Sequence, residues 1–132
     1  MNYIDTSVIV PALAERHENH SVCLPLLQKN AVTSTHALAE AFAVLTAIFK
    51  YPNHVAAKAL SDLAELVTVE EISRKDYLKV LSEARTRGII GGLIYDALHA
   101  ETARRLHADK VFTYNVSNFK HVAHDLVVTE PQ

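Results

Sequence analysis

The sequence predicts a single α/β domain in which a mostly parallel central sheet lies between two layers of helices. Short apolar, β-branched segments alternate with stretches of helical periodicity, and such alternation produces parallel βαβ units with helices on both faces of the sheet. The length of 132 residues is close to that of a typical domain and is enough to bury one core. The composition, 49% hydrophobic and 21% charged, is typical of a soluble globular protein. We therefore expect one three-layer domain over residues 1–132.

The predicted strands are short and rich in apolar or β-branched residues. They cover residues 3–4, 31–33, 66–72, 111–114 and 126–129. Helical periodicity fills the segments between them, over about 7–15, 19–29, 36–50, 53–65, 74–87 and 94–108.

The helix predicted over 36–50 separates large apolar residues from small ones. One stripe carries Leu38, Phe42, Leu45 and Phe49, with Ala41 and Ile48 beside it, and the opposite face carries His36, Glu40, Ala43 and Ala47. We expect the large stripe to face the core. Because small residues allow another element to approach closely, we expect the helix to be covered on both sides, with Glu40 lining a cleft.

The helix predicted over 94–108 has a less polar arc and a solvated face. The arc contains Tyr95, Leu98, His99, Thr102, Ala103 and Leu106, and the solvated face contains Glu101, Arg104 and Arg105. Asp96 lies at the edge of the arc, in the first turn after the glycine-rich segment 88–92, where free backbone N–H groups and the helix dipole favour an anion.

Four polar residues are predicted to meet at one edge of the sheet. Asp5 follows the first strand, and Asn115 follows the strand over 111–114. Glu40 lies in the helix after the strand over 31–33, and Asp96 begins the helix that leads into 111–114. Ligand sites in parallel sheets form outside the carboxyl ends of the strands, near a topological switch point. Asp5, Glu40, Asp96 and Asn115 are therefore the candidate site residues.

Three clustered carboxylates repel one another unless a cation lies among them. Oxygen ligands without cysteine favour a hard ion, magnesium or manganese. Such an ion binds phosphate oxygens and lowers the pKa of a bound water, which makes hydrolysis of a phosphodiester the natural reaction.

Each acid also has a purely structural interpretation. Asp5 fits a helix cap after the strand, Glu40 an ordinary solvated helix residue, and Asp96 a first-turn acid that stabilises the helix dipole. The eight histidines show no ligand spacing, and His99 fits a partly buried polar side chain better than a metal ligand.

Four segments together carry a resemblance to the PIN domain, and more narrowly to the VapC-type toxins of prokaryotic toxin–antitoxin pairs. They are IDTSVIVPAL, HALAEAFAVLT, GIIGGLIYDALHAETA and VFTYNVSNF, and they extend over nearly the whole chain. The resemblance implies a magnesium-dependent endoribonuclease that hydrolyses RNA with a metal-activated water, forms a homodimer and is restrained by a cognate antitoxin. It also implies that Asp5 and Asp96 are the metal ligands, with Glu40 completing the cluster and orienting water.

The chain departs from that pattern where many relatives carry a fourth acid, because Asn115 and Asn118 stand there instead. An Asn can ligate through its carbonyl oxygen but brings no charge, so we expect a weaker or single-metal site. The alternative function is a catalytically weak or inactive PIN-fold module that binds or regulates. A phosphatase of the haloacid-dehalogenase type would need an acid at position 7, where this chain has Ser7.

The remaining predictions concern location and partners. The single cysteine, Cys23, the absence of a signal peptide and the absence of an apolar run of about 20 residues predict a cytoplasmic protein with no membrane contact. The net charge of −2 provides no general attraction for RNA. Local candidates for contacts to RNA phosphates are Arg85, Arg87, Arg104, Arg105 and Lys110, and the helices over 19–29 and 53–65 are candidate dimer interfaces.

Overall fold

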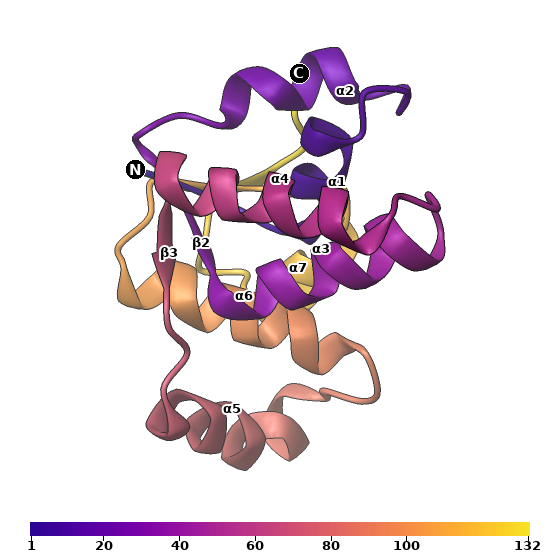
Figure 1. Cartoon of the computed structure of the whole chain (residues 1–132). Helices are drawn as coiled ribbons and strands as arrows, with labels where there is room; N and C mark the ends of the chain where they lie inside the picture. Colours follow the sequence, from indigo (N-terminus) through magenta and orange to yellow (C-terminus); the bar gives the residue numbers. More distant parts are fainter.

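The predicted α/β class is confirmed by a computed structural model that describes residues 1–132 (Figure 1). Its five strands form one sheet in the order β3-β2-β1-β4-β5, and every neighbouring pair is parallel. The strands are β1 (Asn2–Ile4), β2 (Ala31–Ser34), β3 (Thr68–Glu70), β4 (Lys110–Phe112) and β5 (Val128–Thr129).

The strand order places a switch point beside the central strand β1. The chain moves outward from β1 through β2 to β3, then returns to the other side of β1 to form β4 and β5. The strands β1 and β4 therefore lie side by side, with Tyr3 opposite Val111 and Ile4 opposite Phe112. Segments that leave the carboxyl ends of these two strands diverge to opposite sides and open a crevice between them.

Seven α-helices and one 3₁₀ helix accompany the sheet. They are α1 (Thr6–Leu13), α2 (His20–Cys23), η1 (Leu24–Leu26), α3 (Thr35–Ala47), α4 (Asn53–Leu66), α5 (Arg74–Arg87), α6 (Leu93–Arg105) and α7 (Val116–Val122). None of them combines the length and the apolar composition that crossing a lipid bilayer would require.

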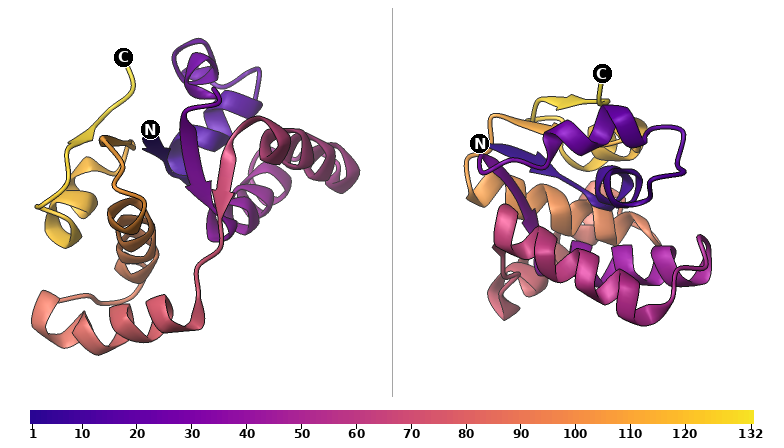
Figure 2. Two further views of the ribbon diagram at one scale, coloured as in Figure 1. Left: turned by 90° about the vertical axis from the view of Figure 1, so that its left-hand side faces the viewer. Right: turned by 45° about the horizontal axis from the view of Figure 1, so that its top comes forward.

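The core is divided between the two faces of the sheet. Ile4 and Ala31 point to the side packed by α1, α3 and α4, whereas Tyr3 and Val32 point to the side packed by α5, α6 and α7. The left view of Figure 2 shows the strands between these two helical layers, with α5 at the far end of the molecule. Both faces are covered, so successive residues of the central strands, such as Tyr3 and Ile4 in β1 and Ala31 and Val32 in β2, are apolar on both sides.

Local sequence accounts for the helix ends near the functional edge. Asp5 caps α1 by accepting a hydrogen bond from the Ser7 backbone N–H, and Ser34 caps α3 by accepting one from Ala37. Gly88 ends α5 with a φ of 65°, a left-handed conformation that costs glycine little.

Several predicted boundaries were wrong. The predicted helix over 19–29 consists of α2 and η1 only, because Pro25 lacks a backbone N–H and the helix tightens into a 3₁₀ turn there. Leu66 ends α4 rather than starting a strand. The short helix α7, beginning directly after Asn115, was not predicted at all.

Two predicted helix faces also need correction. In α3 the buried residues are Ala37, Ala41 and Leu45, whereas Ile48 and Phe49 lie beyond the helix end and are exposed. The small residues Ala43 and Ala47 are exposed rather than covered.

Glu101 is not on a solvated face of α6. It is buried, and its carboxylate pairs with Lys79 at 2.6 Å and with Arg104 at 2.8 Å. A carboxylate with two cationic partners can be buried at moderate cost, and one of these partners comes from α5, which the helical pattern of α6 alone does not reveal.

Candidate active site

Asp5 lies at the carboxyl end of β1 and is held by Ser7 of α1 and by Thr113, which follows β4. Its Oδ1 accepts hydrogen bonds from the Ser7 backbone N–H at 3.1 Å and the Ser7 hydroxyl at 2.6 Å. Its Oδ2 accepts one from the Thr113 hydroxyl, which follows β4, at 2.6 Å. Only 1% of the residue is exposed. Asp5 is therefore a helix cap, as the structural interpretation proposed, and it is also a fixed, buried carboxylate at the predicted edge.

Asp96 is a second buried carboxyl group, in the first turn of α6. Burial and the nearby charge of Asp5 raise the pKa of Asp96 to about 6, and the Asn118 side chain lowers it only in part. Burial also raises the pKa of Asp5, against the effects of His99, Ser7 and Thr113. Neither acid forms an ion pair with a lysine or an arginine. The charge of Asp5 thus disfavours that of Asp96, and His99 lowers the pKa of both carboxyl groups only in part.

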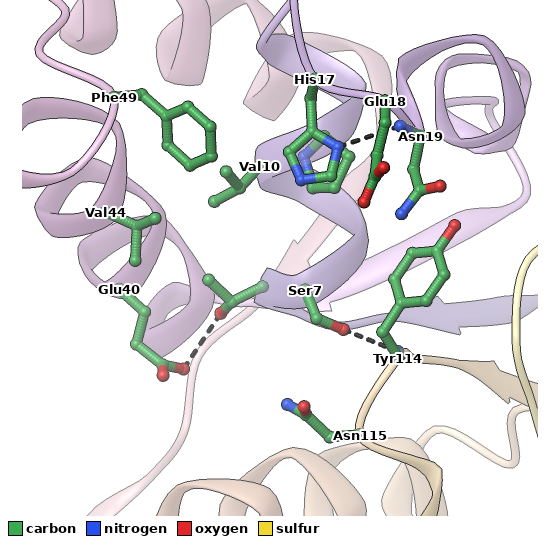
Figure 3. Close-up of a pocket in the computed structure, with 12 residues that line it drawn as sticks. Ser7, Val10, His17, Glu18, Asn19, Glu40, Val44, Phe49, Tyr114 and Asn115 are labelled. Atoms are coloured by element: carbon green, nitrogen blue, oxygen red, sulfur yellow. Dashed lines mark hydrogen bonds between the residues drawn. The ribbon is translucent and has the colours of Figure 1, made fainter.

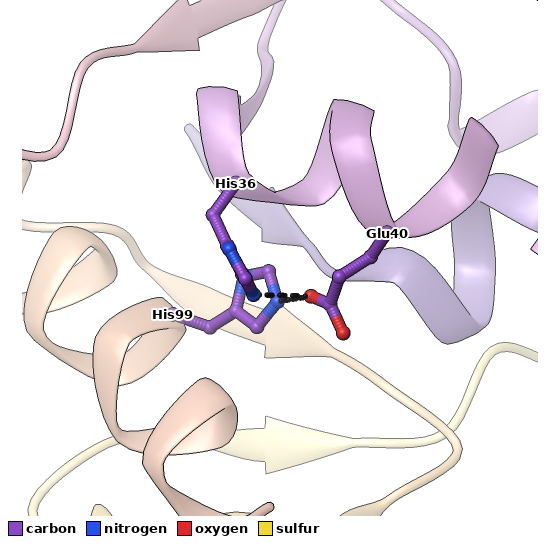
Figure 4. A group of neighbouring side chains, drawn as sticks. All are labelled: His36, Glu40 and His99. Atoms are coloured by element: carbon purple, nitrogen blue, oxygen red, sulfur yellow. Dashed lines mark hydrogen bonds and ion pairs between the residues drawn. The ribbon is translucent and has the colours of Figure 1, made fainter. Parts of the chain in front are cut away.

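Glu40 approaches the site from the first half of α3. Its Oε1 accepts hydrogen bonds from the Thr6 hydroxyl at 3.0 Å and lies 2.8 Å from His99 Nε2 and 3.0 Å from His36 Nε2 (Figure 4). Burial alone would raise the pKa of Glu40, but the imidazoles of His36 and His99 beside its carboxylate outweigh this effect and lower the pKa below its usual range. Glu40 is therefore an ionised, half-buried carboxylate rather than a solvated helix residue.

The histidine beside Glu40 is anchored from the core. His99 Nδ1 lies 2.6 Å from the hydroxyl of Tyr3 in β1, and both side chains are buried. Burial raises the pKa of Tyr3 well above its usual value, so its hydroxyl stays neutral. A chain of contacts thus runs from Tyr3 through His99 to Glu40, which agrees with the prediction that His99 is a buried polar side chain.

Asn115 and Asn118 lie at the start of α7, beside the acids. Asn115 is exposed, and its backbone N–H donates to the Thr113 hydroxyl at 2.9 Å. Its side chain forms no capping hydrogen bond. Neither residue adds a charge to the cluster, so the structure brings together three carboxylates and two neutral amides.

A cleft of about 510 Å³ opens beside this cluster (Figure 3). Its polar end is lined by Thr6, Ser7, Glu40 and Asn115. The cleft extends between α1 and α3 past Val10 and Val44 to His17 and Phe49. The volume lies within the range of natural ligand sites, about 300–1,000 Å³. Glu40 is thus accessible from a groove that is polar at one end and carries Phe49 at the other.

The donors around Asp5 and Asp96 fit a hard divalent cation. Both residues offer carboxylate oxygens, and Oδ2 of Asp5, which accepts a single hydrogen bond, keeps a lone pair free. The raised pKa values of both carboxyl groups show that a positive charge would be stabilised there. A second possible ligand group is formed by His36, Glu40 and His99, whose ligand atoms lie within 4.8 Å of one another.

Most of the predicted RNA-contacting cations are engaged within the protein. Arg104 pairs with Asp125 and Glu101, Arg105 pairs with Glu70 and Asp76, and Arg87 pairs with Glu83. Arg85 and Lys110 are exposed and form no ion pair, although Lys110 lies 5.7 Å from the ring centre of Phe112. These two remain available to an anionic partner.

Sequence reasoning missed three residues of the site: Thr113, His36 and Tyr3. A signal existed for His36, because it lies four residues before Glu40 on one face of a helix. No local signal links Thr113 to Asp5 or Tyr3 to His99, since the members of these pairs are more than ninety residues apart in the chain.

Solved structures resemble this fold over its whole length. The toxin VapC20 of Mycobacterium tuberculosis, which cleaves the Sarcin-Ricin loop, has a TM-score of 0.79 at 16% identity and covers 99% of this chain and 100% of its own. VapBC2 of Rickettsia felis, bound to a promoter DNA fragment, has a TM-score of 0.70 at 24% identity, with 100% of both chains covered. VapBC-1 of nontypeable Haemophilus influenzae has a TM-score of 0.66 at 24% identity, with 98% of both covered. These similarities show a common fold.

Sequence comparison points to the same family. Among proteins with curated descriptions, none matches this chain at a significant level. The PIN domain family, in contrast, matches residues 3–125, which include the three acids, both asparagines and all strands except β5 and the first residue of β1. This protein belongs to the PIN domain family.

Proposed function

We propose that this chain is a magnesium- or manganese-dependent endoribonuclease and the toxin of a toxin–antitoxin pair. The observation that carries the proposal is the pair Asp5 and Asp96. Both carboxyl groups are buried, both have raised pKa values, and neither has a lysine or arginine partner. Such a pair at the carboxyl edge of a parallel sheet, next to an open cleft, is suited to bind a divalent cation.

The roles of the acids follow from their surroundings. Asp5 and Asp96 would hold the ion, and the bound ion would supply a water of lowered pKa and charge stabilisation at the scissile phosphate. Glu40 keeps its charge because its pKa is lowered, and its Oε1 is fixed by Thr6 and His99. Its other oxygen, Oε2, makes no hydrogen bond within the protein and would orient the attacking water.

Asn115 and Asn118 would leave the site with a single ion. Their amides can hydrogen-bond a metal-bound water, but they add no negative charge for a second cation. The asparagines would thus make the site weaker than one with four acids.

The direct test is cleavage of RNA by the purified protein with magnesium and with EDTA. Asp5→Asn and Asp96→Asn should each reduce the rate at least about 100-fold, since even outer-shell partners of metal ligands contribute about 10–100-fold. Asp62→Asn is the matched control, because Asp62 is an exposed acid on α4 that pairs only with Lys58. Full activity of Asp5→Asn, or cleavage that ignores magnesium, would contradict the proposal.

A second candidate function is an inactive PIN-fold binding module, favoured by Asn115 at the place of a fourth acid. Calorimetry with magnesium separates the two functions. Binding near millimolar magnesium that Asp96→Asn abolishes supports the nuclease. The absence of such binding in the native protein supports the module.

The partner would be an antitoxin, since a nuclease that attacks cellular RNA must be restrained in the cytoplasm. VapBC2 and VapBC-1, which share the fold, are toxin–antitoxin complexes, and we propose a similar complex, built on a homodimer, for this chain. A basic side chain of the antitoxin could reach Asp5 and Asp96 through the cleft and displace the metal. Expression of this chain alone should arrest growth, and Asp5→Asn should relieve the arrest at equal protein levels.

A further inference from the structure

We propose that His36, Glu40 and His99 form a binding site for a borderline divalent cation such as zinc, distinct from the hard-cation site at Asp5 and Asp96. The three side chains come from two helices, α3 and α6, and point toward one another (Figure 4). Their ligand atoms lie within 4.8 Å of one another. The site shares Glu40 with the cluster of the proposed ribonuclease, but the binding of zinc by these three side chains does not require ribonuclease activity.

The separations suit a small cation. Oε1 of Glu40 lies 3.0 Å from His36 Nε2 and 2.8 Å from His99 Nε2. In a tetrahedral zinc site with metal–ligand bonds of about 2.0–2.1 Å, ligand atoms lie about 3.3 Å apart. Small side-chain rotations therefore convert the present contacts into coordination distances.

The ring nitrogen Nε2 of His36 is a buried polar atom that is available to bind a ligand. His36 Nε2 is buried from solvent, yet it makes no hydrogen bond of acceptable geometry despite its proximity to Glu40. Its ring is stacked on Tyr95, with ring centres 5.0 Å apart and planes inclined by 18°. The 3.0 Å contact of His36 Nε2 with Oε1 of Glu40 is thus an ion-pair contact without hydrogen-bond geometry, and a metal ion between Nε2 and Oε1 would give both atoms a direct bond.

His99 is prepared to act as a ligand by its contact with Tyr3. The hydroxyl of Tyr3 lies 2.6 Å from Nδ1, and both groups are buried. When Nδ1 carries the proton and donates it to Tyr3, the Nε2 lone pair faces Glu40. Metal-binding histidines characteristically donate their second ring N–H to such an outer partner, which fixes the tautomer and the ring orientation.

The ligand types select the ion. Two imidazoles and one carboxylate suit zinc and neighbouring transition metals, whereas magnesium prefers oxygen ligands. Three protein ligands leave a fourth coordination position of the ion open, and a water molecule would occupy it. The two cation sites of this protein would therefore have different preferences, oxygen-binding ions at Asp5–Asp96 and zinc-type ions at His36–Glu40–His99.

Zinc titration of the full-length protein tests this inference, using calorimetry and competition with a chromophoric chelator. The native protein should bind one tight equivalent of zinc, and the double variant Asp5→Asn/Asp96→Asn should retain it. His36→Gln and His99→Gln should each weaken binding at least 10-fold. His54→Gln, an exposed histidine of α4 without hydrogen bonds, should bind zinc as the native protein does.

Cobalt substitution supplies a second measurement. Bound Co²⁺ should give visible absorption bands of low-symmetry nitrogen and oxygen coordination, and these bands should disappear in His36→Gln. Because part of the His36 side chain reaches solvent, this variant should remain folded, which circular dichroism verifies. Zinc binding that His36→Gln leaves unchanged, or that the aspartate double variant removes, would overturn the proposal. Failure of RNA cleavage with intact zinc binding would reject only the ribonuclease.

Discussion

The hydroxyl of Thr113 donates a 2.6 Å hydrogen bond to Oδ2 of Asp5, across the ends of two adjacent parallel strands. Both residues are buried, and Thr113 also accepts a hydrogen bond from the Asn115 backbone N–H. This single hydroxyl therefore connects the carboxylate of β1 to the loop that carries Asn115.

Removing the hydroxyl of Thr113 should lower the stability of the protein. Thr113→Val keeps the side-chain shape but leaves Asp5 Oδ2 and the Asn115 N–H without their partner, which should destabilise the protein by about 1–3 kcal/mol. The free energy of unfolding, measured by urea titration in EDTA, checks this prediction. Thr113→Ser, which keeps the hydroxyl, is the matched control, and equal stabilities of the native protein and Thr113→Val would refute it.

The raised pKa of Asp96 predicts a pH dependence of stability in the absence of metal. The pKa of Asp96 is about 6 in the folded protein, against an ordinary value of 3.8 in the unfolded chain. The folded state therefore binds more protons than the unfolded state between these values, and stability should fall as the pH rises from about 4 to 6. Thermal unfolding in EDTA across this range measures the effect.

Two comparisons isolate the contribution of Asp96 to this slope. Asp96→Asn, which cannot titrate, should show a flatter profile over the same range. Millimolar magnesium should restore stability chiefly above pH 6, where Asp96 is charged. A native profile that coincides with that of Asp96→Asn would show that Asp96 does not titrate in this way.

Tyr3→Phe should separate the two proposed metal sites. The substitution removes only the hydroxyl that holds His99 Nδ1, so zinc affinity should fall about 10–100-fold, as for other outer partners of metal-binding histidines. Magnesium binding at Asp5 and Asp96 should change much less. Parallel calorimetric titrations with both ions measure the difference, and equal losses for the two metals would argue against separate sites.

Asn115→Asp should add a ligand at the mouth of the cleft. Asn115 is exposed and lines the cleft together with Glu40, so a carboxylate there adds negative charge without burial. We expect tighter binding of a second magnesium ion, visible as increased stoichiometry in calorimetry. If Asn115→Asp binds a second magnesium ion no better than the native protein does, position 115 does not contribute to the metal site.

The acids of the site were predictable because their signals are local. Asp5 follows an apolar strand, and Asp96 occupies the first turn of a helix, so strand ends and helix starts alone place them at one edge. The contact between His99 and Glu40, in contrast, joins residues 59 positions apart and depends on how α6 crosses α3. The pattern of apolar residues within either helix does not reveal that His99 contacts Glu40.

The errors have similar physical causes. Phe49 fits the apolar stripe of α3, but the helix ends at Ala47, so Phe49 lies beyond the helical stripe, and the chain turns at Lys50, which adopts a positive φ of 61°. Phe49 instead lies beside His17 at the apolar end of the cleft. Glu101 was misplaced because Lys79, a partner that accompanies its burial, comes from a different helix.

The central position of β1 has a consequence for the order in which the protein can assemble during synthesis. The strand β1 is made first, but one of its two neighbours, β4, is made only at residues 110–112. Such long-range pairing delays folding, since the intervening loop must close before the contacts form. A nascent chain that ends before residue 110 contains Asp5, Glu40 and Asp96 but not the strand that completes the edge. The three carboxylates can therefore reach their final arrangement only after the ribosome has released residues 110–112.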